Sequence, residues 1–133
     1  RYVRIELKSP MSTTTTVRIN ELQVLNASGT NLAKGKTVVA TPGTTNPKAL
    51  VDGRTFSNNY WQATVPQPGF SSANAIFAYV DLKSAYGVKQ IKLYQGSNYY
   101  PTEYYLYVSP DAQNWTQIVG NVAGAGGVVT FNF

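Results

Sequence analysis

The sequence predicts an all-β protein with about eight to ten short antiparallel strands, arranged as a sandwich or a barrel. Apolar residues alternate with a period of two in one segment after another, which is the pattern of half-buried strands. Clusters of Gly, Pro, Asn and Ser recur about every 8–12 residues, as expected for the turns between such strands. The 133 residues suffice to bury one core, so we expect residues 1–133 to form a single domain.

The chain opens with two predicted strands, at 1–8 and 17–25, joined by a polar loop. In the first, apolar residues at odd positions alternate with polar ones, which predicts an antiparallel strand with one buried face. In the second, the apolar residues change parity at Asn20 and Glu21. One inserted residue is the simplest device that produces such a shift, so we expect a β-bulge there.

The middle of the chain is rich in turns. Residues 26–35 form a predicted connection, and residues 36–40 form a short strand. A loop with two prolines at 41–48 then leads into an apolar strand end at 49–51. A second long loop, at 65–75, carries an aromatic ring near its middle.

The rest of the chain is predicted to be a ladder of strands at 77–82, 90–94, 103–109, 115–119 and 128–133. Alternation within each strand indicates which side chains are buried. The side chains expected to face the core are Ala78, Val80, Leu82, Ile91, Leu93, Tyr104, Leu106 and Val108, and we also expect Trp61 and Trp115 in the core.

The composition excludes several chemistries. The chain has no Cys and no His, so it holds no disulfide, no zinc site of the usual type, no cysteine nucleophile and no histidine base. Glycosidase chemistry needs two carboxylates that face each other across a cleft, and the chain has only six acidic residues. We therefore expect no enzyme.

The net charge of +5 comes from basic residues that are scattered singly along the chain. This pattern is typical of a solvated positive surface, or of a mild preference for acidic glycans or anionic surfaces. No basic stripe suggests nucleic-acid binding, and no run of about 18 apolar residues predicts a transmembrane segment. Because the chain begins inside a predicted strand without an initiator Met, we expect an excised piece of a larger or tandem-repeat protein with other domains.

Several stretches carry a family resemblance. ALVDG…YW at 49–61, followed by the ladder at 79–118, resembles the discoidin or coagulation-factor-5/8 C-type domain, whose galactose-binding-like bacterial members are sugar-binding modules. RYVRIEL at 1–7 and INELQVL at 19–25 look like the closing strands of that family. The resemblance implies a jelly-roll β-sandwich. In the family this pair ends the domain and a segment like NLAKGKTV, here at 31–38, begins it, so the order is that of a circular permutation.

Two acidic residues form a candidate cation site. Asp52 precedes a glycine turn, and Glu21 lies at the predicted bulge. Carboxylates and loop carbonyls are the ligands that Ca²⁺ prefers, and the resemblance implies a structural calcium here. In the alternative, Asp52 only caps its turn and Glu21 only pairs with a Lys or Arg. The implied ligands are side-chain oxygens of Asp52, Glu21 and Asn59, which stands where members usually have Ser or Thr, and backbone carbonyls of Ala49, Arg54 and Asn20.

The loops at one end of the predicted sandwich offer a candidate glycan site. Sugar recognition needs aromatic rings for the C–H face of a pyranose and polar groups for its hydroxyls. The His and Arg that several galactose-binding members place in their pocket have no clear equivalents here. The candidate contacts are Tyr60, Phe70, Gln95, Asn98, Tyr99, Tyr100, Asn46 and Lys48.

The resemblance implies a non-catalytic carbohydrate-binding module, lectin-like, that attaches a secreted or surface protein to cell-surface or cell-wall glycans. One alternative is a structural or adhesion repeat of a virion or cell-surface protein. Another is a membrane- or protein-binding domain, for which Phe70 is the only obvious apolar spike and the basic residues are dispersed.

Overall fold

The computed structural model describes residues 1–9, 16–56, 58–64 and 75–133. Within them the chain forms strands and one short 3₁₀ helix, and every pair of strands is antiparallel. The elements are β1 (Tyr2–Ser9), β2 (Thr16–Ile19), β3 (Glu21–Leu25), β4 (Thr37–Ala40), η1 (Pro47–Val51), β5 (Trp61–Thr64), β6 (Ile76–Asp81), β7 (Gln90–Gln95), β8 (Glu103–Ser109), β9 (Thr116–Ala123) and β10 (Gly127–Asn132).

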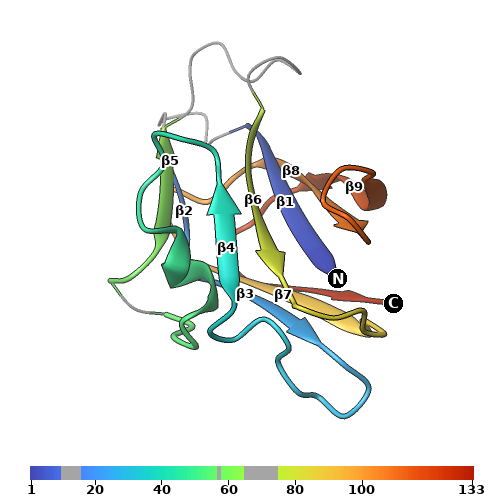
Figure 1. Ribbon diagram of the computed structural model, residues 1–133. Coiled ribbons are helices and arrows are strands. Elements are labelled where there is room, and N and C mark those ends of the chain that lie inside the picture. Colours follow the sequence, from blue (N-terminus) through green and yellow to red (C-terminus); the bar gives the residue numbers. More distant parts are fainter. Residues whose placement is uncertain (10–15, 57, 65–74) are drawn as a thin grey trace.

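The strands form three sheets, and the predicted all-β sandwich is confirmed. A five-stranded sheet has the order β4-β6-β1-β8-β9, a three-stranded sheet has the order β10-β7-β3, and β2 pairs with β5. Figure 1 shows the three-stranded sheet crossing below the five-stranded one, with the β2–β5 pair at the left and both termini at the right. The first strand of the sequence therefore lies in the middle of the largest sheet.

The core fills the space between the sheets with the residues that the alternation selects. Every apolar side chain on the odd face of β1 is buried, as are the predicted inward residues of β6 and β7. On β8, Tyr104 and Leu106 are fully buried, while Val108 is partly buried against the core. Trp61 is 0% exposed at the start of β5, a strand that the sequence did not reveal.

The change of parity at Asn20 and Glu21 has a different cause from the expected bulge. β2 ends at Ile19 and pairs with β5, whereas β3 begins at Glu21 and pairs with β7 in another sheet. Asn20 lies between them, and its N–H donates to the Tyr94 carbonyl at 2.9 Å. The chain passes from one sheet to the next at this residue, so the buried face changes parity without an inserted residue.

The predicted strand end at 49–51 is wrong. Residues Pro47–Val51 form the 3₁₀ helix η1, with a proline at its start. Its last three residues, Ala49 to Val51, are all buried, which a strand with one buried face does not allow. Asn46, just before it, has φ 54°, a left-handed conformation that asparagine tolerates better than most residues.

The prediction that Trp115 is a core residue is also wrong. Trp115 is half-buried on the outer face of the five-stranded sheet, with its ring centre 5.5 Å from that of Tyr79. The Arg4 guanidinium lies over this ring at 5.3 Å, and it also lies 4.4 Å from the ring centre of Phe77. Glu6 accepts a hydrogen bond from Arg4 at 2.6 Å. Cation–π and ion-pair contacts therefore stabilise this outer face.

No helix in the described ranges is long and apolar enough to cross a membrane.

Candidate functional site

The two candidate carboxylates of the cation site meet in the folded chain. Glu21 is 0% exposed, and both of its carboxylate oxygens accept the N–H of Gly53 at 3.2 Å. Gly53 has φ 84°, so a residue with a side chain would be strained in this turn. The carboxyl group of Asp52 lies within hydrogen-bonding reach of Glu21. Residues 31 positions apart in the sequence thus form one acidic pair, here called the Glu21–Asp52 pair.

Burial and, to a smaller extent, the neighbouring carboxyl group of Asp52 raise the pKa of Glu21 to about 8. The Gly53 N–H and the charge of Lys34 act in the opposite direction. No salt bridge joins Glu21 to any Lys or Arg, all of which lie in the described part of the chain. Two carboxylates in contact repel each other unless a proton or a cation neutralises part of their charge. The Glu21–Asp52 pair can therefore hold either a proton or a cation.

Asp52 also holds its own turn together. Its Oδ1 accepts the Arg54 N–H at 2.8 Å, and its Oδ2 accepts a bond from the amide nitrogen of Asn59. Asn59 in turn accepts a hydrogen bond from Asn46 at 2.6 Å through its Oδ1. The structure therefore shows Asp52 capping its own turn. Asn59 directs its nitrogen, not its oxygen, toward Asp52.

The donor set fits a hard cation only with help from carbonyl oxygens. Among the described residues, no group of three or more His, Cys, Asp or Glu side chains comes together. The predicted backbone ligands Ala49 and Arg54 flank Asp52 on the chain, and Asn20 precedes Glu21. Ca²⁺ accepts such mixed ligand sets of carboxylates and carbonyls. The buried Glu21 carboxyl group, for which no salt bridge is found among the described residues, is the feature that favours a cation.

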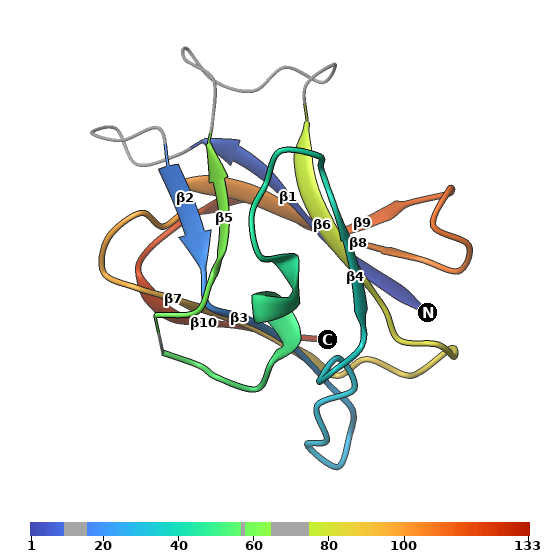
Figure 2. The same ribbon diagram turned by 60° about the vertical axis from the view of Figure 1, so that its left-hand side comes forward.

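A separate hollow of about 230 Å³ lies next to this pair. It opens between β2, the residue before β5 and the loop that joins β7 to β8. Figure 2 shows that this loop runs beside β2. Asn20 belongs to its wall, so the hollow and the Glu21–Asp52 pair are joined through one peptide bond. The lining residues are Arg18, Asn20, Tyr60, Gly96, Ser97, Asn98 and Tyr99.

Arg18 lines this hollow, and its guanidinium lies against two tyrosine rings. Its guanidinium carbon lies 4.6 Å from the ring centre of Tyr60 and 4.3 Å from that of Tyr99. Its Nε donates to Gln62 Oε1 at 2.8 Å, and Gln62 is its cross-strand partner on β5. Its backbone N–H donates to the Tyr99 carbonyl at 2.8 Å. The arginine is thus oriented by three different neighbours.

The structure brings only some of the predicted glycan contacts to this hollow. Tyr60, Asn98 and Tyr99 line it, and Tyr99 is 37% exposed. Gln95 is 0% exposed, and its Nε2 donates to the Ala125 carbonyl at 3.1 Å. Because it faces the interior, Gln95 is not available for the contact that we predicted. Tyr100 is half-buried and does not line the hollow.

The remaining predicted contacts lie elsewhere. Asn46 hydrogen-bonds to Asn59 beside the Glu21–Asp52 pair, and Lys48 is exposed on η1. Neither lines the hollow. Phe70 lies outside the described residues, so its predicted contact stays a prediction.

Sequence reasoning missed Arg18, whose guanidinium lies against both tyrosine rings of the hollow. Its only signal was its position as the outward residue between Val17 and Ile19. The partner strand β5 carries Gln62 and follows Tyr60, but β5 was not recognised, so Arg18 could not be connected with Tyr60.

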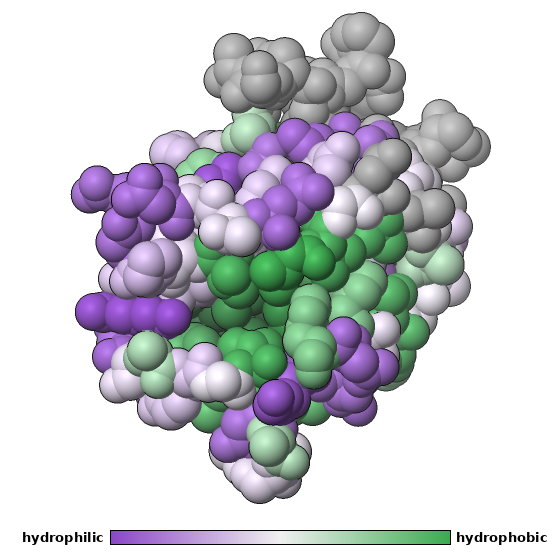
Figure 3. Space-filling model, turned by 90° about the vertical axis from the view of Figure 1, so that its right-hand side faces the viewer, coloured by the Kyte–Doolittle hydropathy of each residue, from purple (hydrophilic) through white to green (hydrophobic). Residues whose placement is uncertain are grey.

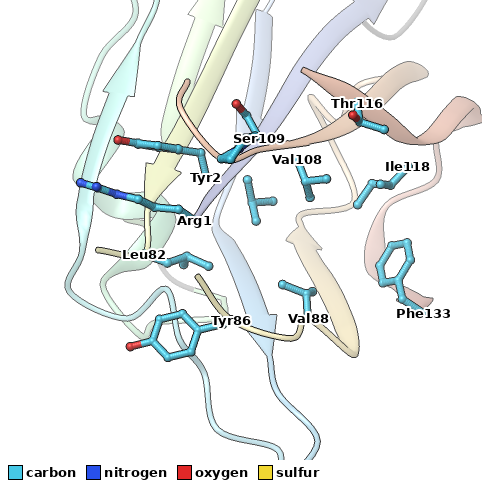
Figure 4. Close-up of a pocket in the computed structure, with 12 residues that line it drawn as sticks. Arg1, Tyr2, Leu82, Tyr86, Val88, Val108, Ser109, Thr116, Ile118 and Phe133 are labelled. Atoms are coloured by element: carbon cyan, nitrogen blue, oxygen red, sulfur yellow. The ribbon is translucent and has the colours of Figure 1, made fainter. Parts of the chain in front are cut away.

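A second, apolar hollow of about 390 Å³ opens on the face that holds the termini. Figure 3 shows it as a green depression, and Figure 4 shows Leu82, Val88 and Ile118 along it. Tyr86 and Phe133 form its rim and are 45% and 46% exposed. This hollow could not be predicted from the sequence, because its wall comes from strand ends and one loop that are far apart in the chain.

The family can now be identified. A family model of the F5/8 type C domain matches residues 26–133, which is most of the chain. The chain belongs to the F5/8 type C (discoidin) domain family. Domains of this family are often carbohydrate- or membrane-binding modules, are generally non-catalytic, and usually occur in extracellular or surface proteins. No curated protein and no solved structure matched the chain.

This F5/8 type C domain has its first 25 residues outside the family match. Those residues include β1, which pairs with both β6 and β8 in the middle of the five-stranded sheet. The first strand of the sequence thus occupies a central place in its sheet, although the family match begins only at residue 26. The circularly permuted order stays a prediction.

Proposed function

We propose that this F5/8 type C domain is a non-catalytic carbohydrate-binding module, and that its glycan site is the hollow around Arg18. The observation that carries the proposal is the cluster of Arg18, Tyr60 and Tyr99. Tyrosine rings offer an apolar face and a hydroxyl group, which together suit the two sides of a sugar ring. Asn98 and Ser97 add neutral hydrogen-bonding groups to the same wall.

The size and rigidity of the hollow support this proposal. A volume of about 230 Å³ is small, which favours one sugar unit of a glycan over a large ligand. Tyr99 has φ 63°, a conformation that most residues avoid, and its carbonyl is bonded to β2. A loop held in this way loses little freedom when it binds a ligand.

The role that we propose for the Glu21–Asp52 pair is to bind a structural Ca²⁺. The carboxylates of Glu21 and Asp52 would hold the ion, with carbonyl oxygens of Ala49, Arg54 and Asn20. Asn59 would contribute its Oδ1 after its amide turns over. The ion would supply the positive charge that the buried Glu21 lacks, and it would fix the Asn20 end of the hollow.

A glycan array tests the proposed function directly. The wild-type domain is expected to bind a subset of glycans, and Tyr60→Ala is expected to weaken that binding at least tenfold, or about 1.4 kcal/mol. Tyr105→Ala is the matched control, because Tyr105 packs against Lys8 on the outer sheet face and lies away from the hollow. Absence of glycan binding at millimolar concentrations, together with binding to anionic vesicles, would replace the proposal with membrane adhesion.

A further inference from the structure

Among the residues that the structure describes, the charge of Arg18 has no acidic partner. All six acidic residues lie in the described part of the chain. The salt bridges found there use Arg1, Arg4, Lys8 and Lys83 as the basic partners, and none of them includes Arg18. Within the described part of the chain, the half-buried Arg18 guanidinium therefore has no counter-charge.

The contacts that Arg18 does make leave one part of its side chain available. The two tyrosine rings lie against the guanidinium, and Gln62 accepts the bond from Nε. No hydrogen bond from the two terminal nitrogens, Nη1 and Nη2, is found within the described residues. These two nitrogens form the end of the guanidinium fork, which matches the two oxygens of a carboxylate.

The wall around Arg18 adds no negative charge. Its other members are Asn, Ser, Gly and Tyr residues, all neutral. A single positive charge in a small hollow with partly apolar walls attracts an anion more strongly than the same charge on an open surface. The overall charge of +5 acts in the same direction.

We propose that the glycans bound here carry a carboxylate, as hexuronic acids do, and that Arg18 binds this group through Nη1 and Nη2. This inference rests on the proposed glycan-binding function of the same hollow. The rings of Tyr60 and Tyr99 contact the sugar, Asn98 and Ser97 bind hydroxyl groups, and Arg18 selects acidic over neutral sugars. The carboxylate is favoured over a sulfate because it is planar and matches the planar fork in a bidentate arrangement.

Calorimetry with matched sugar pairs tests the inference. Oligomers of galacturonic acid and galactose, and of glucuronic acid and glucose, are titrated into the wild-type domain at about 0.1 M salt. We expect each acidic oligomer to bind at least tenfold more tightly than its neutral counterpart. Equal or tighter binding of the neutral oligomers would overturn the inference and leave the proposed function standing, whereas binding of neither kind would overturn the proposed function itself. Tighter binding of a sulfated galactose oligomer than of the uronate would overturn the choice of a carboxylate.

Three variants separate the Arg18 contact from general charge. Arg18→Gln is expected to lower the affinity for the acidic oligomers more than the affinity for the neutral ones, so that the preference for the acidic oligomers is lost. Arg18→Lys keeps the charge but loses the fork, and it is expected to retain only part of the preference. Lys89→Gln removes the same charge from an exposed site outside the hollow and is expected to keep the wild-type preference. Equal losses in Lys89→Gln and Arg18→Gln, or equal loss of neutral and acidic binding in Arg18→Gln, would overturn the proposed contact.

Discussion

Arg18 and Tyr99 are joined twice, once through their backbones and once through their side chains. The Arg18 N–H donates to the Tyr99 carbonyl at 2.8 Å, while the guanidinium lies 4.3 Å from the centre of the Tyr99 ring. The first contact fixes the β7–β8 loop on β2, and the second positions the arginine in the hollow. The recognition surface is therefore built by a strand and a loop that are about 80 residues apart.

The β7–β8 loop depends on a glycine from another turn. A Cβ atom at Gly126 would lie 2.7 Å from the Gly96 carbonyl and 3.2 Å from the Tyr100 ring. Gly126→Ala should therefore displace the loop that carries Asn98 and Tyr99 and should weaken glycan binding at least tenfold. Gly87→Ala is the control, because no atom lies within 4 Å of its added Cβ. If calorimetry gave the same glycan affinity for Gly126→Ala as for the wild type, glycan binding would not depend on the position of the β7–β8 loop.

The Glu21–Asp52 pair predicts a response to calcium. Addition of Ca²⁺ to the EDTA-treated domain should raise the melting temperature by several degrees, because a ligand at 100 times its Kd contributes about 2.7 kcal/mol. Glu21→Gln should abolish this rise. Mg²⁺ at the same concentration should act more weakly, since it requires stricter geometry. An identical melting curve in Ca²⁺ and in EDTA would contradict the calcium proposal.

Tyr104 predicts a loss of stability at alkaline pH. It is 0% exposed, its hydroxyl has no hydrogen-bond partner within the described chain, and burial raises the pKa of Tyr104 to about 12. The ordinary pKa in the unfolded chain is about 10. Between about pH 10 and 12 the phenol ionises readily in the unfolded chain but not in the folded one, so the free energy of unfolding falls over this range. Below about pH 10 the phenol is neutral in both states and the stability is not reduced.

Tyr104→Phe tests whether the buried phenol causes this loss of stability at high pH. The variant should be as stable as the wild type at pH 7 to within about 1 kcal/mol, because it removes a polar group that has no partner. Between about pH 10 and 12 its free energy of unfolding in urea should fall less steeply than that of the wild type. Tyr86→Phe, which removes an exposed phenol, controls for the loss of one tyrosine. Parallel pH profiles for the wild type and Tyr104→Phe would refute the prediction.

The contacts of Arg4 on the outer face of the five-stranded sheet should contribute to the free energy of unfolding. Its guanidinium contacts the rings of Phe77 and Trp115 and pairs with Glu6. Arg4→Met should lower the free energy of unfolding by about 1–2 kcal/mol. Arg54→Met should change it by less than about 0.5 kcal/mol, because the exposed Arg54 side chain makes no ion pair or ring contact in the described ranges. Equal effects of the two substitutions would contradict this role of Arg4.

The strands with a strict alternation could be predicted from the sequence. In β1, β6 and β7 the period of two depends only on local geometry, so the buried face follows from the residue order. The 3₁₀ helix η1, at Pro47–Val51, could not be predicted in the same way. Three consecutive apolar residues suit either a strand or a buried helical turn, and only the packing of η1 decides between them.

The cation pair was predicted through the family resemblance, and the structure brings Glu21 and Asp52 together. The glycan set was predicted less well, because aromatic and amide residues in loops do not reveal which way they face. Gln95 shows the difficulty, since it continues the inward alternation of β7 and lies inside. Arg18 shows the converse, because its partners come from a strand and a loop that only the fold places beside it.

The hollow around Arg18, Tyr60 and Tyr99 is the proposed sugar-binding site of this domain. The most direct test is a series of ¹H–¹⁵N NMR spectra recorded while the best glycan from the array is added to the wild-type domain. We predict that the largest shifts occur at the Arg18 Nε–H and at the backbone amides of Asn98 and Tyr99. Chemical-shift changes confined to residues of the apolar hollow, near Tyr86 and Phe133, with no change in the Arg18 signal, would contradict this proposal.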